Sequence, residues 1–320
     1  MKSYIITMTG FAVIFPASRI AYKLGVPVFM TNLPFLAAVR FTGEDAGDFL
    51  HNQLSNDVLG LADGESAFAC YCEPKGRVLA LVLICRSGDE FHAVMARELA
   101  EAVTGRLQMY VLRAKVDIEV LEQQAVLGLE GDTPVNARDF ATVIPVPGTE
   151  RSVLLMDQKM GPDTISDALP SGGVSGEIVS GSISEEDVSA ETWKAEELRQ
   201  GITWLCPATS GKFLPQWLGF DELGAVNFRK GCYPGQEIVA RTRYLGKVKR
   251  HPRLLRLDLE TCPGPMDKLE LSGEGQTADA VAVDCVKLGP DETLLFVVTR
   301  MDPETDVEQI DYQDQAETAS

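Results

Sequence analysis

The sequence lacks the features that identify membrane, secreted or metal-binding proteins. No run of apolar residues is long enough for a membrane-spanning helix, so we expect no membrane partner. The first 29 residues lack the small-residue cleavage site that follows the apolar core of a signal peptide, and we predict none. The histidines are too scattered to indicate a metal cluster or a catalytic triad, and we predict no metal site; they are His51, His92 and His251.

Cysteine is also scarce and shows no framework spacing. The seven cysteines are an odd number, at positions 70, 72, 85, 206, 232, 262 and 285. Cys70 and Cys72 are separated by one residue, whereas zinc sites usually combine two pairs with longer spacing, and no second pair exists. We therefore predict reduced thiols in a cytoplasmic protein.

Basic residues are a minority, with 29 Lys and Arg against 47 Asp and Glu, which gives a net charge of -18. Such a surface disfavours general nucleic-acid binding, and we expect no stable nucleic-acid partner. One segment differs. Between Arg229 and Arg256 the chain carries nine Lys and Arg and a single acid, Glu237. A basic segment in so acidic a chain indicates an anionic ligand or partner at this place.

The basic segment begins with the motif KGCYPGQE at residues 230–237. Its Pro-Gly pair predicts a tight turn, and Gly231 and Gly235 allow the backbone to approach a ligand closely. Lys230 lies beside Cys232, and neighbouring cations favour the thiolate that acts as a nucleophile or metal ligand. The alternative is a buried structural cysteine in a glycine-rich turn, but the clustered cations and glycines favour a functional site.

The motif, with Val239-Ala240-Arg241 after it, resembles the signature of the YgfZ family of folate-binding proteins. Three other segments resemble the family in the right order: residues 45–58, 74–77 and 213–216. The resemblance implies an α+β fold of the aminomethyltransferase type, with three domains around a folate pocket and a small C-terminal β-barrel. It also implies a tetrahydrofolate-binding accessory protein for synthesis or repair of iron–sulfur clusters. Its clients would include radical S-adenosylmethionine enzymes that modify tRNA.

The resemblance also implies roles for individual residues. Cys232 would be the functional thiol at the pocket rim, assisted by Lys230. The folate-binding residues would be Trp193, which resembles the family's pocket tryptophan, and Gly231, Tyr233, Gly235, Gln236, Glu237 and Arg241. Arg241 would pair with the carboxylates of the glutamate tail of folate. The acid that recognises the pterin is left open, because both Glu196 and Glu197 follow Trp193.

Two other functions are left open. The first is a folate-dependent one-carbon transferase or demethylase. The related aminomethyltransferase has a catalytic Asp near the start of its second hairpin strand. Residues 75–80, at the matching place in this chain, contain no carboxylate. This absence favours a non-enzymatic factor with iron–sulfur client or assembly proteins as partners. The second alternative is an RNA-binding scaffold that uses the basic segment and binds with strong salt dependence.

Apolar patterning predicts the order of elements. Strands are expected at 35–41, 66–72, 78–85, 91–95, 115–121, 125–129, 152–156, 254–259, 281–288 and 293–299, and helices at 46–54, 96–109 and 191–200. Residues 73–77 predict a hairpin turn. We divide the chain into an N-terminal segment (1–27), an N-terminal α+β domain (28–130), a middle α+β domain with the cysteine motif (131–245), a C-terminal β-barrel (246–301) and a disordered acidic tail (302–320).

Overall fold

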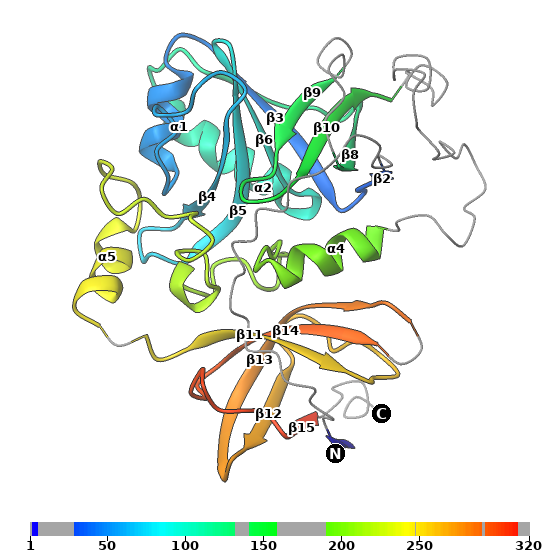
Figure 1. Cartoon of the computed structure of the whole chain (residues 1–320). Coiled ribbons are helices and arrows are strands. Elements are labelled where there is room, and N and C mark those ends of the chain that lie inside the picture. The colour runs from blue at the N-terminus through cyan, green and yellow to red at the C-terminus, as the bar shows by residue number, and fades with distance from the viewer. Residues whose placement is uncertain are drawn as a thin grey trace, which may run out of the picture.

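The computed structural model describes residues 2–5, 29–131, 141–158, 190–246, 248–289 and 292–312. These residues form three antiparallel sheets with helices packed against them (Figure 1). The predicted α+β class is confirmed. In the part of the chain described here, no helix is both long and apolar enough to cross a membrane.

The first sheet has the strand order β4-β5-β6-β3-β7. Its strands are β3 (Leu36–Thr42), β4 (Ser66–Cys72), β5 (Val78–Ser87), β6 (Glu90–Ala96) and β7 (Asp117–Val120), and its helices are α1 (Ala46–Gln53) and α2 (Arg97–Val111). The predicted hairpin is β4–β5. Most of β5 is buried on both faces, which explains its continuous apolar run. This strand gives the turn at residues 73–77 a rigid base.

The second sheet has the order β2-β8-β10-β9. It contains β2 (Phe29–Asn32), β8 (Gln124–Glu130), β9 (Thr142–Pro145) and β10 (Arg151–Asp157), and the helix α4 (Ala190–Arg199) packs near it. Every residue of β8 pairs with β10. The sheet therefore takes strands from both sides of the predicted boundary at residue 130. The helix α4 ends before Gly201, which has a φ of +75°, as the sequence predicted.

The third sheet has the order β1-β15-β12-β13-β14-β11. Its strands are β1 (Lys2–Ile5), β11 (His251–Leu257), β12 (Lys268–Gly273), β13 (Gln276–Lys287), β14 (Thr293–Thr299) and β15 (Gln309–Tyr312). Among the described strands, β1 and β11 are edges and do not pair with each other. The predicted closed barrel is therefore not confirmed.

Two expectations for this region were wrong. The predicted disordered tail includes β15, which pairs with β1 and β12, and Val307 and Ile310 are buried there. Ile310 and Tyr312 alternate with less buried residues along β15 and give this strand one buried face. Residues 313–320 lie outside the described part. Cys262, in the loop after β11, and Cys285, on β13, form a disulfide with 5.8 Å between their Cα atoms. The other five cysteines form no disulfide.

Ion pairs join α4 to the third sheet. Lys194 Nζ lies 2.6 Å from Asp284 Oδ1 on β13, and burial raises the pKa of Asp284. Arg199 and Arg256 both contact Glu292, at 3.5 and 3.2 Å. These contacts fix the sheet against the helix that carries Trp193.

Candidate functional site

The segments that carry the family resemblance meet around the Cys232 loop, defined here as residues 227–235. The first contact is between two turns. Gly76 and Gly235 have φ angles of +75° and +83°. A Cβ on Gly235 would lie 2.5 Å from the Glu73 carbonyl oxygen and 2.6 Å from the Gly76 Cα. Only glycine fits both the conformation and the approach at Gly235. The predicted tight turn is present, and α5 (Gln236–Tyr244) begins directly after it.

The second contact joins the chain before the motif to the loop after α1. Buried Ser55 donates its Oγ hydrogen to the Ala225 carbonyl at 2.6 Å and accepts the Cys70 N–H on the same oxygen at 2.7 Å. Asn56 donates to the Gly224 carbonyl at 2.8 Å, and the Asn227 N–H donates to the Ser55 carbonyl at 2.9 Å. The Cys232 loop is thereby tied to β4 through backbone and side-chain hydrogen bonds.

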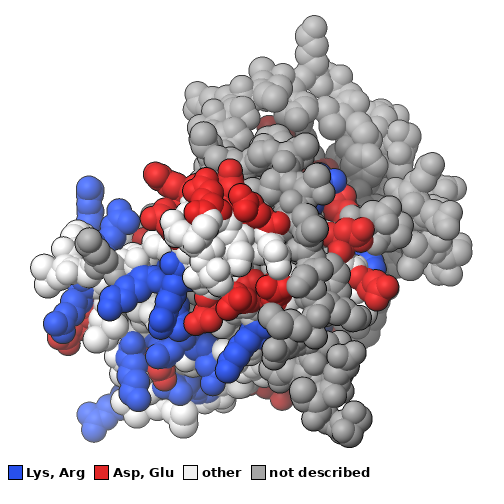
Figure 2. Space-filling view, turned by 90° about the horizontal axis from the view of Figure 1, so that it is seen from below, with Lys and Arg blue, Asp and Glu red and all other residues white. Residues whose placement is uncertain are grey.

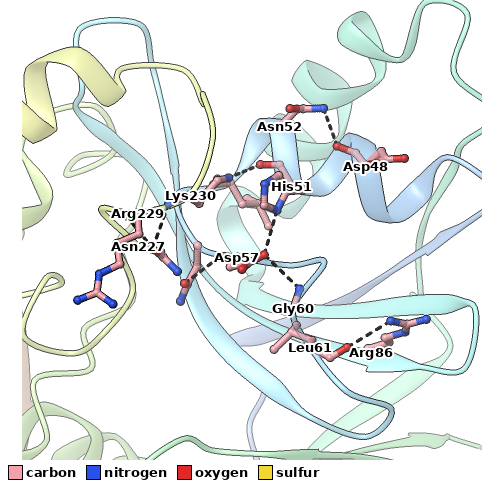
Figure 3. Close-up of polar contacts among 12 residues, drawn as sticks. Asp48, His51, Asn52, Asp57, Gly60, Leu61, Arg86, Asn227, Arg229 and Lys230 are labelled. Atoms are coloured by element: carbon pink, nitrogen blue, oxygen red, sulfur yellow. Dashed lines mark hydrogen bonds and ion pairs between the residues drawn. The ribbon is translucent and has the colours of Figure 1, made fainter.

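Lys230 makes the third contact (Figure 3). Its Nζ donates to the carbonyls of His51 and Leu54, the latter at 2.6 Å. These carbonyls lie at the end of α1, where backbone acceptors lack intrahelical partners and the helix dipole favours a cation. Burial lowers the pKa of Lys230 to about 8, and the charges of Asp57 and Cys232 oppose this. Among the described contacts, none joins Nζ directly to the thiol, so Lys230 holds the loop in place.

The residues around Lys230 include three that we did not predict as functional. His51 Nδ1 lies 3.2 Å from Asp57 Oδ1, and Asp57 also accepts the Gly60 N–H at 3.1 Å (Figure 3). Asn227 Oδ1 accepts the backbone N–H groups of Arg229 and Lys230 at 2.8 and 3.2 Å. Asp57 lies inside the segment 45–58 that resembles the family, and this was the only signal for it.

Cys232 is exposed, whereas the next residue, Tyr233, is buried. The Lys230 Nζ lies 5.3 Å from the centroid of the Tyr233 ring, and burial raises the pKa of Tyr233. Tyr233 therefore anchors the loop while the thiol faces outward. Gly231 is exposed, and a Cβ there would meet nothing within 4 Å. Gly235 is the position where the backbone closely approaches another turn of the protein, and the approach of both glycines to a ligand stays a prediction.

The remaining motif residues lie on α5. Gln236 donates its Nε2 hydrogen to the Lys230 carbonyl at 3.3 Å, and Gln216 donates to the Val239 carbonyl at 2.8 Å. Glu237 is exposed in the first turn, where the helix dipole favours an acid. Arg241 is exposed in the last turn, where the helix dipole favours a basic residue. Figure 2 views the molecule from below Figure 1. On the face that it shows, Lys and Arg side chains gather on one side, beside a group of acids.

Trp193 lies elsewhere, between α4 and the second sheet. Its side chain is buried, with the Arg151 guanidinium carbon 3.5 Å from the ring centroid. A Cβ on Gly128 would lie 2.6 Å from the same ring. The described contacts do not join Trp193 to the Cys232 loop. The predicted stacking on a pterin is therefore not available while Arg151 covers the ring.

The structure distinguishes the two acids after Trp193. Glu196 is 40% exposed and pairs with Arg199. Glu197 is buried and accepts the Trp204 indole N–H at 2.9 Å. Burial raises the pKa of Glu197 to about 7, although Trp204, Trp193, Arg151 and Lys194 stabilise the ionised form. Glu197 is thus the acid with the environment of a buried binding group.

The two glycines of the loop give a matched pair of variants. Gly235→Ala should destabilise the protein by roughly 2–5 kcal/mol, because the left-handed backbone is strained by a Cβ that also overlaps the turn at Gly76. Gly231→Ala should change stability by less than about 0.5 kcal/mol, since its Cβ enters open space. Urea unfolding measures both, and equal effects would contradict the proposed contact.

Lys230 gives a pH-dependent prediction. Its folded pKa of about 8 lies below the ordinary value of 10.5, so between these pH values the folded state binds fewer protons. The free-energy cost of burying the charged ammonium group of Lys230 is fully present below pH 8 and is lost as the pH rises to 10.5. The stability of wild type relative to Lys230→Met should therefore increase by roughly 1–2 kcal/mol from pH 7 to 10. Lys268→Met on β12 is the control. A pH-independent difference for Lys230→Met would refute the assignment.

Comparison with known proteins supports the fold and the resemblance. No family model matches the chain. The tRNA-modifying protein YgfZ of Escherichia coli O157:H7 (strain EC4115 / EHEC) is 28% identical over 305 residues, which cover 91% of each chain. The protein of the same name from Escherichia fergusonii is 26% identical over 310 residues, again 91% of each.

A solved structure, the glycine cleavage system aminomethyltransferase T of Bartonella henselae, aligns with a TM-score of 0.63 at 14% identity. The alignment covers 91% of this chain and 86% of that one. At this identity the likeness shows the fold alone. The predicted resemblance to the YgfZ family and the predicted aminomethyltransferase-like fold are both confirmed.

Proposed function

We propose that this protein is a tetrahydrofolate-binding accessory factor that supports synthesis or repair of iron–sulfur clusters in client enzymes. The clients include radical S-adenosylmethionine enzymes that modify tRNA. The observation that carries the proposal is the exposed thiol of Cys232 on an anchored loop. The relatives are named tRNA-modifying proteins, which supports a role in tRNA modification.

The environment of Cys232 differs from that of a structural cysteine. Cys70, Cys72 and Cys85 are buried, whereas Cys232 is exposed. Its loop is held by the contact between Gly235 and the hairpin turn and by Lys230 on α1. A thiol on a fixed, accessible loop can ligate a cluster or meet the thiol of a partner without first unfolding the protein. Lys230 is a positioning residue that also adds positive charge near the thiol.

The residues around Trp193 fit the chemistry of folate. Arg151 has its Nε and Nη1 buried without hydrogen-bond partners, and Glu197 offers a buried carboxyl group. A pterin has N–H donors for a carboxylate and ring acceptors for a guanidinium. Stacking on Trp193 requires the Arg151 side chain to leave the ring. Folate would supply the one-carbon carrier, and the residues of this chain would bind and orient it.

Aminomethyl transfer is not part of the proposal. Residues 75–80 contain no carboxylate at the place that matches the catalytic Asp of the related enzyme. Five cysteines outside any disulfide favour a reducing compartment such as the cytoplasm, whereas the Cys262–Cys285 disulfide is more typical of an oxidising one.

The thiol is tested in cells that lack their own homologous protein. Cys232→Ala should reduce the thiolated nucleosides of tRNA to the level of cells without the gene, because the reactive sulfur is lost. Mass spectrometry of digested tRNA measures this. Cys206→Ala removes another free, partly exposed thiol and should keep the modification. Full modification by a folded Cys232→Ala protein would refute the role of the thiol.

Folate binding is tested by calorimetric titration with tetrahydrofolate. Wild type should bind it saturably, and Trp193→Phe should weaken binding about tenfold, since the larger ring stacks better. Trp217→Phe is the matched control, because this tryptophan faces Arg250 at 5.1 Å outside the proposed pocket. If wild type releases no heat and shows no change in Trp fluorescence, folate has no place in the function and only the thiol remains.

A further inference from the structure

A cleft of about 380 Å³ opens beside the Cys232 loop. It lies between residues 224–229 and the end of α5, and its lining includes Phe228, Arg229, Arg243 and Tyr244. It is a shallow depression that is open to solvent, so a ligand there would keep much of its surface exposed. No acid belongs to the lining. We infer that this cleft binds one nucleotide of a single-stranded nucleic acid, with the base on Tyr244 and the phosphate on Arg229.

Tyr244 provides the surface for the base. Its side chain is 67% exposed at the last residue of α5. The ring of Phe228 lies 5.9 Å away at an angle of 73°, in edge-to-face contact. Arg243 covers Phe228 at 5.5 Å and pairs with Asp221 at 3.3 Å. Phe228 thus contacts the tyrosine ring while most of Tyr244 stays exposed, which is what a stacking base needs.

Arg229 provides the charge for the phosphate. Its side chain is exposed, and the described contacts assign no partner to its guanidinium group. Its backbone is fixed by the hydrogen bond from its N–H to Asn227 Oδ1. The exposed Arg241 and Lys249 extend the positive charge along the same segment. Charge-assisted hydrogen bonds from a planar guanidinium suit a phosphate group.

Asn227 adds a polar group to the cleft wall. Its Oδ1 is occupied by two backbone N–H groups, so the amide nitrogen is the atom left for a ligand. Asn56, in contrast, uses its amide nitrogen on the carbonyls of Phe68 and Gly224. A hydrogen bond to a base edge would come from Asn227.

The observations favour a nucleotide over an acidic protein segment. Both carry negative charge, but every nucleotide also has a flat ring beside that charge, whereas an acidic segment has one only where it contains an aromatic residue. The net charge of -18 repels a polyanion from the rest of the surface, so binding should be weak and sensitive to salt. The inference is independent of folate binding and of the Cys232 thiol.

The test is fluorescence anisotropy with the full chain and labelled oligoadenylate RNA of about ten nucleotides. Binding should be saturable at about 50 mM salt and weaken as salt increases. Tyr244→Ala should weaken it about 5- to 100-fold, while Tyr244→Phe keeps it. Arg229→Gln should reduce the magnitude of the slope of log binding constant against log salt concentration by about 0.7. The matched controls, Tyr110→Ala on α2 and Arg300→Gln after β14, should bind as wild type does.

Other probes separate the possible ligands. If DNA of the same sequence binds with equal affinity, the cleft recognises the base and the phosphate. If RNA binds more tightly, a contact to the 2′-hydroxyl adds to this recognition. Absence of binding by wild type overturns the inference, as do equal effects of Tyr244→Ala and Tyr110→Ala. Equal affinity for duplex RNA excludes stacking on Tyr244. If a polyglutamate peptide binds as tightly and depends on Tyr244, the cleft is a docking site for an acidic protein instead.

Discussion

The position of the functional loop depends on one backbone contact, between the turn of the β4–β5 hairpin and the Pro-Gly turn before α5. Neither turn leaves room for a side chain at Gly76 or Gly235. The hairpin includes the largely buried strand β5, so the contact transmits the rigidity of a core strand to a surface loop. Ser55 and Lys230 fix the other side of the loop to the end of α1. The exposed thiol is therefore held from two directions.

Much of the fold follows from local pattern. The strands and helices of the first sheet agree with the predicted order, because apolar spacing over a few residues decides them. The site was predictable where a motif carries its own geometry, as in the turn at Gly235. It was not predictable where partners come from distant segments. Lys230 binds carbonyls 179 and 176 residues away, and Trp193 is covered by residues of β8 and β10.

The same limit applies to the basic segment. Its positive charge was evident in the sequence, but the structure shows that some of its cations are paired and others are exposed. Arg243 and Arg256 pair with acids, and Lys230 is bonded to backbone carbonyls. Arg229 and Arg241 remain exposed. Only part of the positive charge is thus available to a ligand, since the rest neutralises neighbouring acids and helix-end carbonyls.

The pairing of β1 with β15 joins residues 2–5 to residues 309–312 in one sheet. This pairing has the largest sequence separation among the described strand pairs, which gives the third sheet a high contact order and slows its formation. Because β12 pairs with β13 on one side and with β15 on the other, we expect its outer edge to stay open during translation until β15 leaves the ribosome. A chain that stops before residue 309 would keep this edge unpaired and could aggregate through it.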